Sequence, residues 1–128
     1  MRIASLIARI LLGLIFLVFG LNGFLHLIPM GALPPGPAGQ FLGALFESHY
    51  ALVVSAFQVA GGVLLLINRY VPLGLTLLAP VILNIFLFHL LMAPTGLPLA
   101  IIVVILWLIV FYRHRQYFSG VFVQRTEP

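Results

Sequence analysis

Four long apolar runs, almost free of charge, constrain this chain more than any other feature of its sequence. Charged residues make up 6% of its 128 residues and hydrophobic residues 63%, whereas a soluble domain carries about a quarter charged residues. A transmembrane helix needs about 20 mostly apolar residues to cross roughly 30 Å of hydrocarbon. The sequence therefore predicts one all-α domain over residues 1–128, folded as an integral membrane four-helix bundle.

Prolines and glycines set the limits of the predicted spans. The four spans are expected at about residues 3–28, 49–68, 73–93 and 99–112, with an outer loop over 29–48. In that loop, apolar residues recur at helical spacing from Phe41 to Phe46, which predicts a short helix along the membrane surface. Pro80 is expected to kink the third span. The fourth span is short, so we expect Trp107 and Tyr112 to lie at the membrane interface.

The arginines predict how the chain is oriented. They lie near the N-terminus, between the second and third spans, or after the fourth span, at Arg2, Arg9, Arg69, Arg113, Arg115 and Arg125. Cytoplasmic loops of membrane proteins are enriched in Lys and Arg. We therefore expect a multi-pass protein of the bacterial cytoplasmic (inner) membrane, with the bilayer as its first partner and with both termini in the cytoplasm. Arginines that flank apolar runs do not form a phosphate-binding patch, so no nucleic-acid partner is expected.

Small and basic residues inside the first two spans indicate how the helices pack. Gly13 and Gly20 on the first span, and Gly61 and Gly62 on the second, would let two backbones approach closely. Arg9 is expected to extend its side chain back to the inner interface. The chain has no cysteine, which excludes thiol–disulfide chemistry and thiolate metal sites.

Polar side chains inside the spans are the candidates for function, because burying them in hydrocarbon costs several kcal/mol unless they are satisfied. Asn22 and His26 are four residues apart and share a helix face, whereas Asn84 and His89 are five apart and diverge by about 140°. Depth along the helices places them, with Gln58, at the midplane or in the outer half. We expect all five to bind a ligand in one outward-facing polar pocket, with His89 as the catalytic residue. Hydrogen bonds to a neighbouring helix are the structural alternative.

Two other uses of the histidines follow from ligand chemistry. His26 and His89 could bind a haem b from both sides if they lie at matching depth. His26, His49, His89 and Glu47 carry ligand types that suit zinc or iron, but their spacing matches no local metal motif. The sequence analysis therefore assigns no metal and no intrinsic cofactor.

The order of these features resembles the DoxX family of small bacterial membrane proteins over nearly the whole chain. The resemblance is carried by residues 9–24 (RILLGLIFLVFGLNGF), 58–66 (QVAGGVLLL), 68–74 (NRYVPLG) and 84–89 (NIFLFH). Many family members have Glu where this chain has Gln58, so the resemblance does not imply proton transfer at that position. It implies a four-helix membrane bundle and a link to quinone-coupled redox chemistry, because the family is named after subunits of a thiosulfate:quinone oxidoreductase.

The resemblance leads to two hypotheses about function. In the first, the chain is a membrane component of a quinone-linked redox system that binds a quinone or another small amphipathic molecule. His89 would exchange a proton with it, and Phe16, Phe19, Phe86 and Phe88 would line its tail. A redox partner protein would then supply the electron carrier, and homo-oligomers are compatible with this arrangement. In the second, the chain is a non-catalytic, chaperone-like binding or assembly protein that recognises lipid or a membrane partner.

Overall fold

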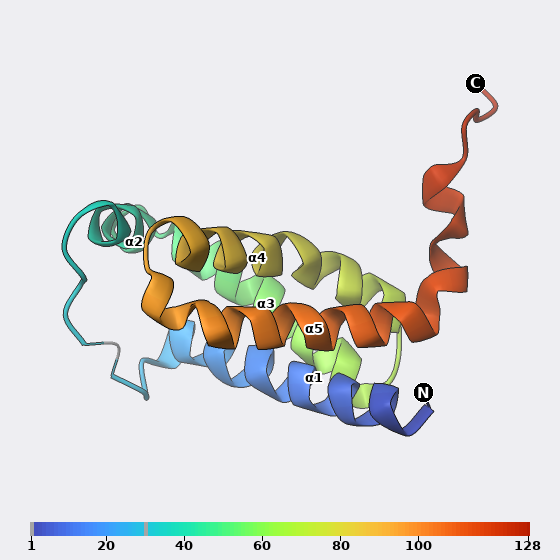
Figure 1. The fold of residues 1–128 in the computed structure, drawn as a ribbon, viewed down its shortest axis with the longest axis horizontal. Helices are drawn as coiled ribbons and strands as arrows, with labels where there is room; N and C mark the ends of the chain where they lie inside the picture. Colours follow the sequence, from blue (N-terminus) through green and yellow to red (C-terminus); the bar gives the residue numbers. More distant parts are fainter. Residues whose placement is uncertain (1, 30) are drawn as a thin grey trace.

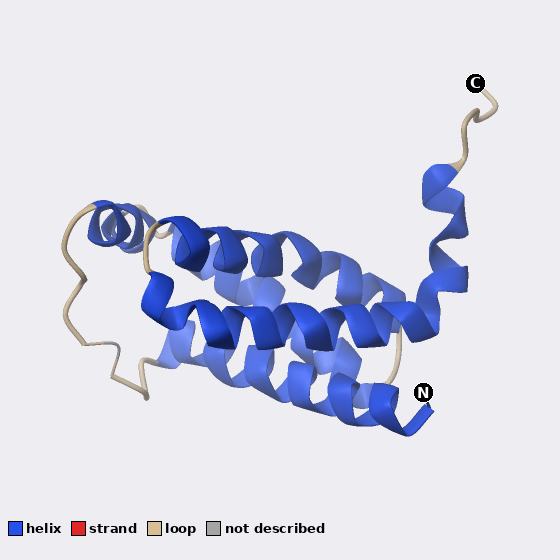
Figure 2. Cartoon of the chain, viewed as in Figure 1, coloured by secondary structure: helices blue, strands red, loops and turns tan. Residues whose placement is uncertain are grey.

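The computed structural model describes residues 2–29 and 31–128; Met1, and Met30 in the expected outer loop, lie outside this description. The described residues are helical and contain no strand (Figure 2). The elements are α1 (Arg2–Leu25), α2 (Pro37–Glu47), α3 (Tyr50–Ile67), α4 (Val71–Leu91), η1 (Pro94–Gly96), α5 (Leu97–His114) and η2 (Arg115–Phe122), where η denotes a 3-10 helix. The all-α class predicted from the sequence is confirmed.

The four long helices lie side by side (Figure 1). α1 packs against α3 and α5, α3 packs against α4, and α4 packs against α5. Both termini and the turn between α3 and α4 lie at one end of this bundle, and α2 and η1 lie at the other (Figure 1). α1, α3, α4 and the helical segment that contains α5 are each long and apolar enough to cross a membrane.

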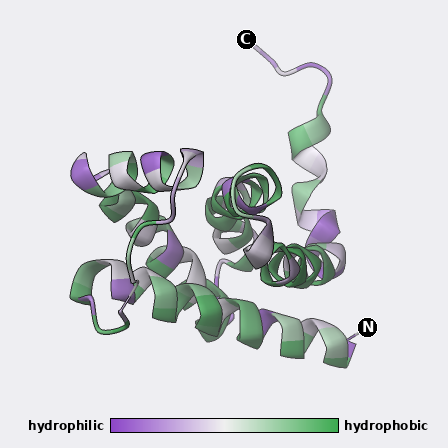
Figure 3. Cartoon of the chain, turned by 60° about the vertical axis from the view of Figure 1, so that its left-hand side comes forward, coloured by the Kyte–Doolittle hydropathy of each residue, from purple (hydrophilic) through white to green (hydrophobic). Residues whose placement is uncertain are grey.

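The outward-facing sides of the long helices are as apolar as their packed sides. Figure 3 shows hydrophobic residues over most of their length. Leu14 on α1, Leu83 on α4 and Ile102 on α5 are 45%, 57% and 51% exposed. Soluble monomers rarely expose contiguous apolar patches of more than a few hundred Å², so this exterior suits contact with lipid chains.

The core lies where the inward faces of the four long helices meet. Its largest fully buried side chains are Leu12, Phe16, Leu65, Leu75, Leu78 and Val110. These residues come from α1, α3, α4 and α5, so each long helix contributes to one continuous cluster. α2 contributes Ala38 as its only buried side chain and packs mainly on α3. The short helix expected between Phe41 and Phe46 is present, and it runs across the end of the bundle (Figure 1).

Glycines bring α1 and α3 into close contact, as the sequence predicts. A Cβ added at Gly62 would lie 2.8 Å from both the Gly13 carbonyl oxygen and the Leu17 backbone nitrogen. A Cβ at Gly20 would lie 2.9 Å from the Cβ of Gln58. On the other side of α3, Gly61 leaves room for the side chain of Leu78 on α4. Three of the four long helices therefore approach one another through positions that only glycine fits.

Arg9 also joins α1 to α3. Its Nη1 donates a hydrogen bond to the carbonyl oxygen of Leu65, which lies in the last turn of α3. The Leu65 carbonyl also accepts a hydrogen bond from the Asn68 backbone N–H at 3.4 Å, so the guanidinium gives it a second donor. The half-buried Arg9 side chain therefore ends on protein backbone rather than extending only to the membrane interface.

The limits of α1 and α4 differ by two or three residues from those of the predicted first and third spans. α1 ends at Leu25 instead of residue 28, because His26 adopts a left-handed φ of 54° and leaves the helix. α4 begins at Val71 instead of residue 73, because Pro72 is accommodated in the first turn, where its missing N–H costs no helical bond. It ends at Leu91 instead of residue 93, and Met92 beyond it has a φ of −121°. α4 remains a continuous α-helix through Pro80.

α5 is longer than the predicted fourth span, and Trp107 lies well inside the helix rather than near its end. α5 covers 18 residues, Leu97–His114, because Pro98 lies in its first turn and the basic residues Arg113 and His114 continue the helix. Trp107 lies in the middle of α5 and donates its indole N–H to the Leu75 carbonyl oxygen of α4 at 3.0 Å. The one tryptophan of the chain therefore links α4 and α5 through a hydrogen bond.

Candidate functional site

Asn22 stabilises the end of α1. It is 7% exposed, and its side-chain oxygen accepts a hydrogen bond from the Ile28 N–H at 2.7 Å while its Nδ2 donates to the Ile28 carbonyl at 3.2 Å. The Asn22 amide thus supplies hydrogen-bond partners to the Ile28 backbone. Ile28 lies just beyond His26, whose left-handed φ ends the helix. These bonds give Asn22 a structural role, and its ligand role remains a prediction.

His26, His49 and Glu47 lie exposed at the α2 end of the bundle. Both histidines have a positive φ, 54° and 65°, and occupy helix boundaries, at the end of α1 and the start of α3. Among the described residues, no group of three His, Cys, Asp or Glu side chains is close enough to hold a metal ion. His26 therefore marks a change in backbone direction, and the structure does not assemble the metal set considered from the sequence.

Gln58 is half-buried at the contact between α3 and α1, opposite Gly20. One turn before it, Ser55 is 6% exposed and packs its hydroxyl against Gly23. Gln58 and Asn22 therefore belong to neighbouring helices. Gln58 lies along the glycine contacts between α1 and α3. Asn22 is about 160° around α1 from Gly20 and lines a different surface, with Val18 and Leu21.

Asn84 and His89 point to different sides of α4, as their spacing predicts. Asn84 is exposed, and its Nδ2 donates to the Pro80 carbonyl oxygen of its own helix at 2.8 Å. His89 is half-buried, and α4 has no π-turn that could rotate it onto the Asn84 side. The structure therefore does not bring Asn84 and His89 into one pocket.

The His89 imidazole is fixed at two points. Its Nδ1 lies 2.9 Å from the Ile85 carbonyl oxygen, one turn earlier in α4. A carbonyl oxygen can only accept, so in the neutral ring Nδ1 carries the hydrogen and Nε2 carries the lone pair. The ring packs against Gly96 in η1, where an added Cβ would lie 2.5 Å from Nε2. His89 thus presents a hydrogen-bond acceptor at the turn that joins α4 to α5.

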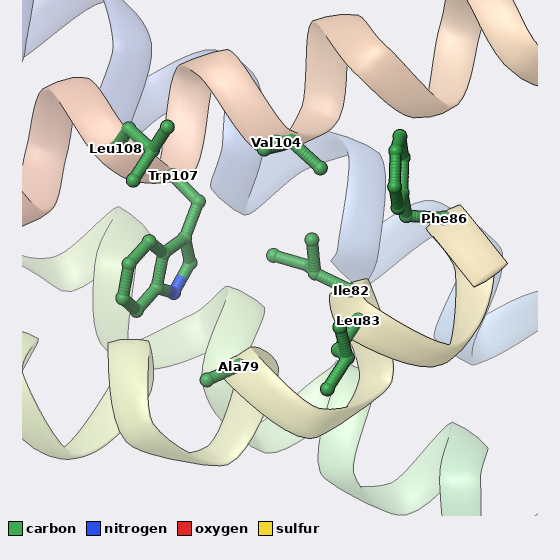
Figure 4. Close-up of a pocket in the computed structure, with 7 residues that line it drawn as sticks. All are labelled: Ala79, Ile82, Leu83, Phe86, Val104, Trp107 and Leu108. Carbon is green, nitrogen blue, oxygen red and sulfur yellow. The ribbon is translucent and has the colours of Figure 1, made fainter.

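An apolar groove runs between the middle parts of α4 and α5. It has a volume of about 220 Å³ and is lined by Ala79, Ile82, Leu83, Phe86, Val104, Trp107 and Leu108. Figure 4 shows Trp107 extending from α5 toward α4, with Ile82 and Val104 in the middle and Phe86 at the far side. Phe86 precedes His89 by three residues. The groove therefore leads along α4 toward the half-buried imidazole.

The four phenylalanines expected around a ligand tail do not line one surface. Phe16 is 2% exposed in the core, and Phe19 is 48% exposed on the outside of α1. Phe88 stacks on Phe41 of α2 with ring centroids 5.6 Å apart. Phe86 alone lines the α4–α5 groove. A second apolar hollow of about 220 Å³ lies at the end of α1 and includes Asn22, but none of the other four predicted site residues.

The α4–α5 groove and the Trp107 bond were missed in the sequence analysis, although one signal was available. A tryptophan in the middle of an apolar run must find an acceptor for its N–H, and hydrocarbon offers none. The arrangement can bind an apolar chain along α4 and α5 and a hydrogen-bonding group beside His89. Comparison with protein-family models, curated proteins and solved structures finds no match for this chain.

Proposed function

We propose that this chain crosses a bacterial cytoplasmic membrane four times, with both termini in the cytoplasm, and binds a small amphipathic molecule of the quinone class. The apolar tail would lie in the α4–α5 groove. The polar head would lie beside His89, at the end of the bundle opposite the two termini, and that end would face the outside. The observation that carries the proposal is the half-buried His89 imidazole, three residues beyond Phe86 of the groove lining.

The chemistry of His89 suits this role. With Nδ1 held by the Ile85 carbonyl, Nε2 can accept a hydrogen bond or a proton from a quinol hydroxyl. Oxidation of the quinol also releases two electrons, and a redox partner protein would supply the carrier that takes them. The chain is thus a binding and proton-accepting component of a quinone-linked redox system. Its resemblance to the DoxX family points to the same chemistry.

The size of the groove limits what it can hold. Sites that enclose a whole drug-sized ligand measure about 300–1,000 Å³, and this groove is about 220 Å³. It therefore accommodates part of an apolar chain and leaves the remainder in the lipid. Its lining carries no charged side chain, which suits an isoprenoid tail and also a lipid acyl chain.

Organic extraction of the protein, purified in mild detergent, tests this proposal. We expect mass analysis to find a quinone in stoichiometric amount in the wild type, and at least tenfold less in His89→Ala. Gly96→Ala should lose the ligand as well, because its Cβ would displace the imidazole from the Ile85 carbonyl.

His114→Ala is the matched control, because its Nδ1 makes the same bond one turn back, 2.9 Å from the Val110 carbonyl oxygen, at the other end of the bundle. It should retain the ligand. Equal ligand loss in His114→Ala and His89→Ala would contradict the proposed site.

A non-catalytic binding or assembly protein is the second candidate, and the purely apolar lining of the groove favours it. In that case, extraction would recover phospholipid rather than quinone. Filling the groove with Val104→Phe would then lower lipid content, while His89→Ala would leave it unchanged.

A further inference from the structure

The outward face of α4 differs from the other lipid-facing surfaces because it carries polar groups. Thr76, Pro80, Asn84 and Leu87 follow one another at intervals of three or four residues, and all four are exposed. Thr76 bonds back to the Pro72 carbonyl at 2.8 Å, which satisfies its hydroxyl hydrogen. Asn84 is the exposed residue on this face whose side chain carries more than one hydrogen-bond donor.

The Asn84 amide has more hydrogen-bonding capacity than its own helix uses. One N–H donates to the Pro80 carbonyl, which is its single hydrogen-bond partner within residues 2–29 and 31–128. The amide has two N–H donors and an oxygen that accepts two bonds, so one donor and the oxygen have no partner among the described residues. Asn84 lies seven residues before the end of α4 at Leu91, which is roughly 10 Å inside the helix end at 1.5 Å per residue.

At this depth the surroundings of an inserted α4 are hydrocarbon, which offers neither donors nor acceptors. The arrangement therefore rests on the membrane insertion proposed above. Two chains related by a two-fold axis bring the same residue face to face. Each Asn84 amide can then donate its remaining N–H to the oxygen of the other, so the residue is its own complement.

We propose that α4 forms the interface of a homodimer in the membrane, with reciprocal hydrogen bonds between the two Asn84 amides at its centre. Pro80 and Leu87, one turn to either side, pack across the same interface. His89 faces the opposite side of α4, toward the turn at Gly96, so dimerisation leaves the proposed ligand site open.

Cysteine cross-linking in native membranes tests this interface, because the chain has no cysteine of its own. Leu87→Cys places a thiol one turn from Asn84. Ile102→Cys on α5 is the control, because Ile102 is also exposed and lies at a similar depth. Ile102 is five residues from the start of α5, and Leu87 is four residues from the end of α4. Mild oxidation should give a covalent dimer from Leu87→Cys at least fivefold more efficiently than from Ile102→Cys.

Changing Asn84 in the Leu87→Cys background separates the amide from general helix contact. Asn84→Leu should lower the dimerisation constant about sevenfold, the factor for two interhelical bonds of about 0.6 kcal/mol each. Asn84→Gln keeps the amide and should retain most of the cross-linking. Equal yields from Leu87→Cys and Ile102→Cys, or an Asn84→Leu variant that cross-links as well as its parent, would overturn the proposal.

Two further readouts keep this result apart from the function proposed above. Extraction of the protein from membranes by alkaline carbonate would refute membrane insertion itself, whereas a retained protein without cross-links refutes only the dimer. The quinone content of Asn84→Leu should equal that of the wild type. A loss of ligand with unchanged cross-linking would instead place Asn84 in the ligand site and overturn the interface.

Discussion

At the scale of single residues, the surroundings of each asparagine decide what it does. Asn22 is buried and holds the backbone of Ile28 through both ends of its amide. Asn84 is exposed, and among the described residues it bonds only the Pro80 carbonyl of its own helix. Asn68 takes a left-handed φ of 56° in the α3–α4 turn, a conformation that Asn tolerates better than most residues. Three residues of one type therefore serve three structural purposes.

Replacing Asn22 tests its role at the end of α1. Asn22→Ala removes the acceptor of the Ile28 N–H and the donor to the Ile28 carbonyl. We expect the free energy of unfolding in detergent to fall by about 1 kcal/mol and residues 26–36 to become more susceptible to limited proteolysis. Gln40→Ala, at an exposed position of α2, should change neither. Unaltered proteolysis of Asn22→Ala would show that these bonds do not hold the loop.

The sequence marks the polar residues of the spans but does not identify their partners. Asn22 and His26 share a helix face only if the helix continues through both, and the left-handed backbone at His26 ends it before then. For Asn84 and His89, spacing alone predicts divergence, and the burial of the two side chains confirms it. Spacing within one helix therefore predicts the relative direction of two side chains. It does not predict a hydrogen-bond partner that a loop supplies, such as Ile28 for Asn22.

At the scale of elements, α1 and α3 pack through backbone rather than through large side chains. A Cβ at Gly62 would meet the Gly13 carbonyl oxygen and the Leu17 nitrogen at 2.8 Å, and backbone atoms cannot move aside as a flexible side chain can. Small residues are the common means of close helix association in lipid, where the hydrophobic effect between helices is absent.

Gly62→Ala should therefore destabilise the bundle. Overpacking of this kind costs about 1–3 kcal/mol, measurable as a shift in the SDS concentration that unfolds the helices in mixed micelles. Gly120→Ala is the matched control, because its added Cβ would have no neighbour within 4 Å. If the two variants unfold together, α1 and α3 do not meet as described.

Trp107 joins α4 and α5 through its bond to the Leu75 carbonyl and stacks on Phe111, with ring centroids 5.1 Å apart. Trp107→Phe keeps an aromatic ring but loses the N–H, so we expect a loss of about 0.6 kcal/mol in unfolding free energy. Trp107→Leu loses the stacking as well and should cost more. Circular dichroism during unfolding measures both, and equal stability of wild type and Trp107→Phe would mean that the bond contributes nothing.

The sequence predicts the existence of the helices well and their ends less well. Long apolar runs identify α1, α3, α4 and α5 because backbone groups in hydrocarbon must bond within the segment. The ends depend on local features that hydropathy does not register. Pro72 and Pro98 lie inside first turns, where proline is favoured, whereas the predicted spans begin just after them. Arg113 and His114 extend α5 although their polarity suggests its end.

At the scale of the whole molecule, charge is distributed unevenly between the two ends of the bundle. The elements that carry arginine are the start of α1, the α3–α4 turn, the end of α5 and the C-terminal segment, and all lie at the end that holds both termini (Figure 1). The opposite end carries Glu47 and no arginine. By the positive-inside rule, the topology proposed above puts the arginine-rich end in the cytoplasm, and α2, η1 and His89 on the outer side.

Thiol labelling of single-cysteine variants in intact cells tests this arrangement most directly. Gln40, Thr95 and Gln124 are all exposed and lie in α2, η1 and the C-terminal segment. We expect an impermeant maleimide to label Gln40→Cys and Thr95→Cys from outside, and to label Gln124→Cys only after the membrane is permeabilised. Labelling of Gln124→Cys in intact cells, with Gln40→Cys and Thr95→Cys protected, would contradict the account and place the proposed ligand site on the cytoplasmic side.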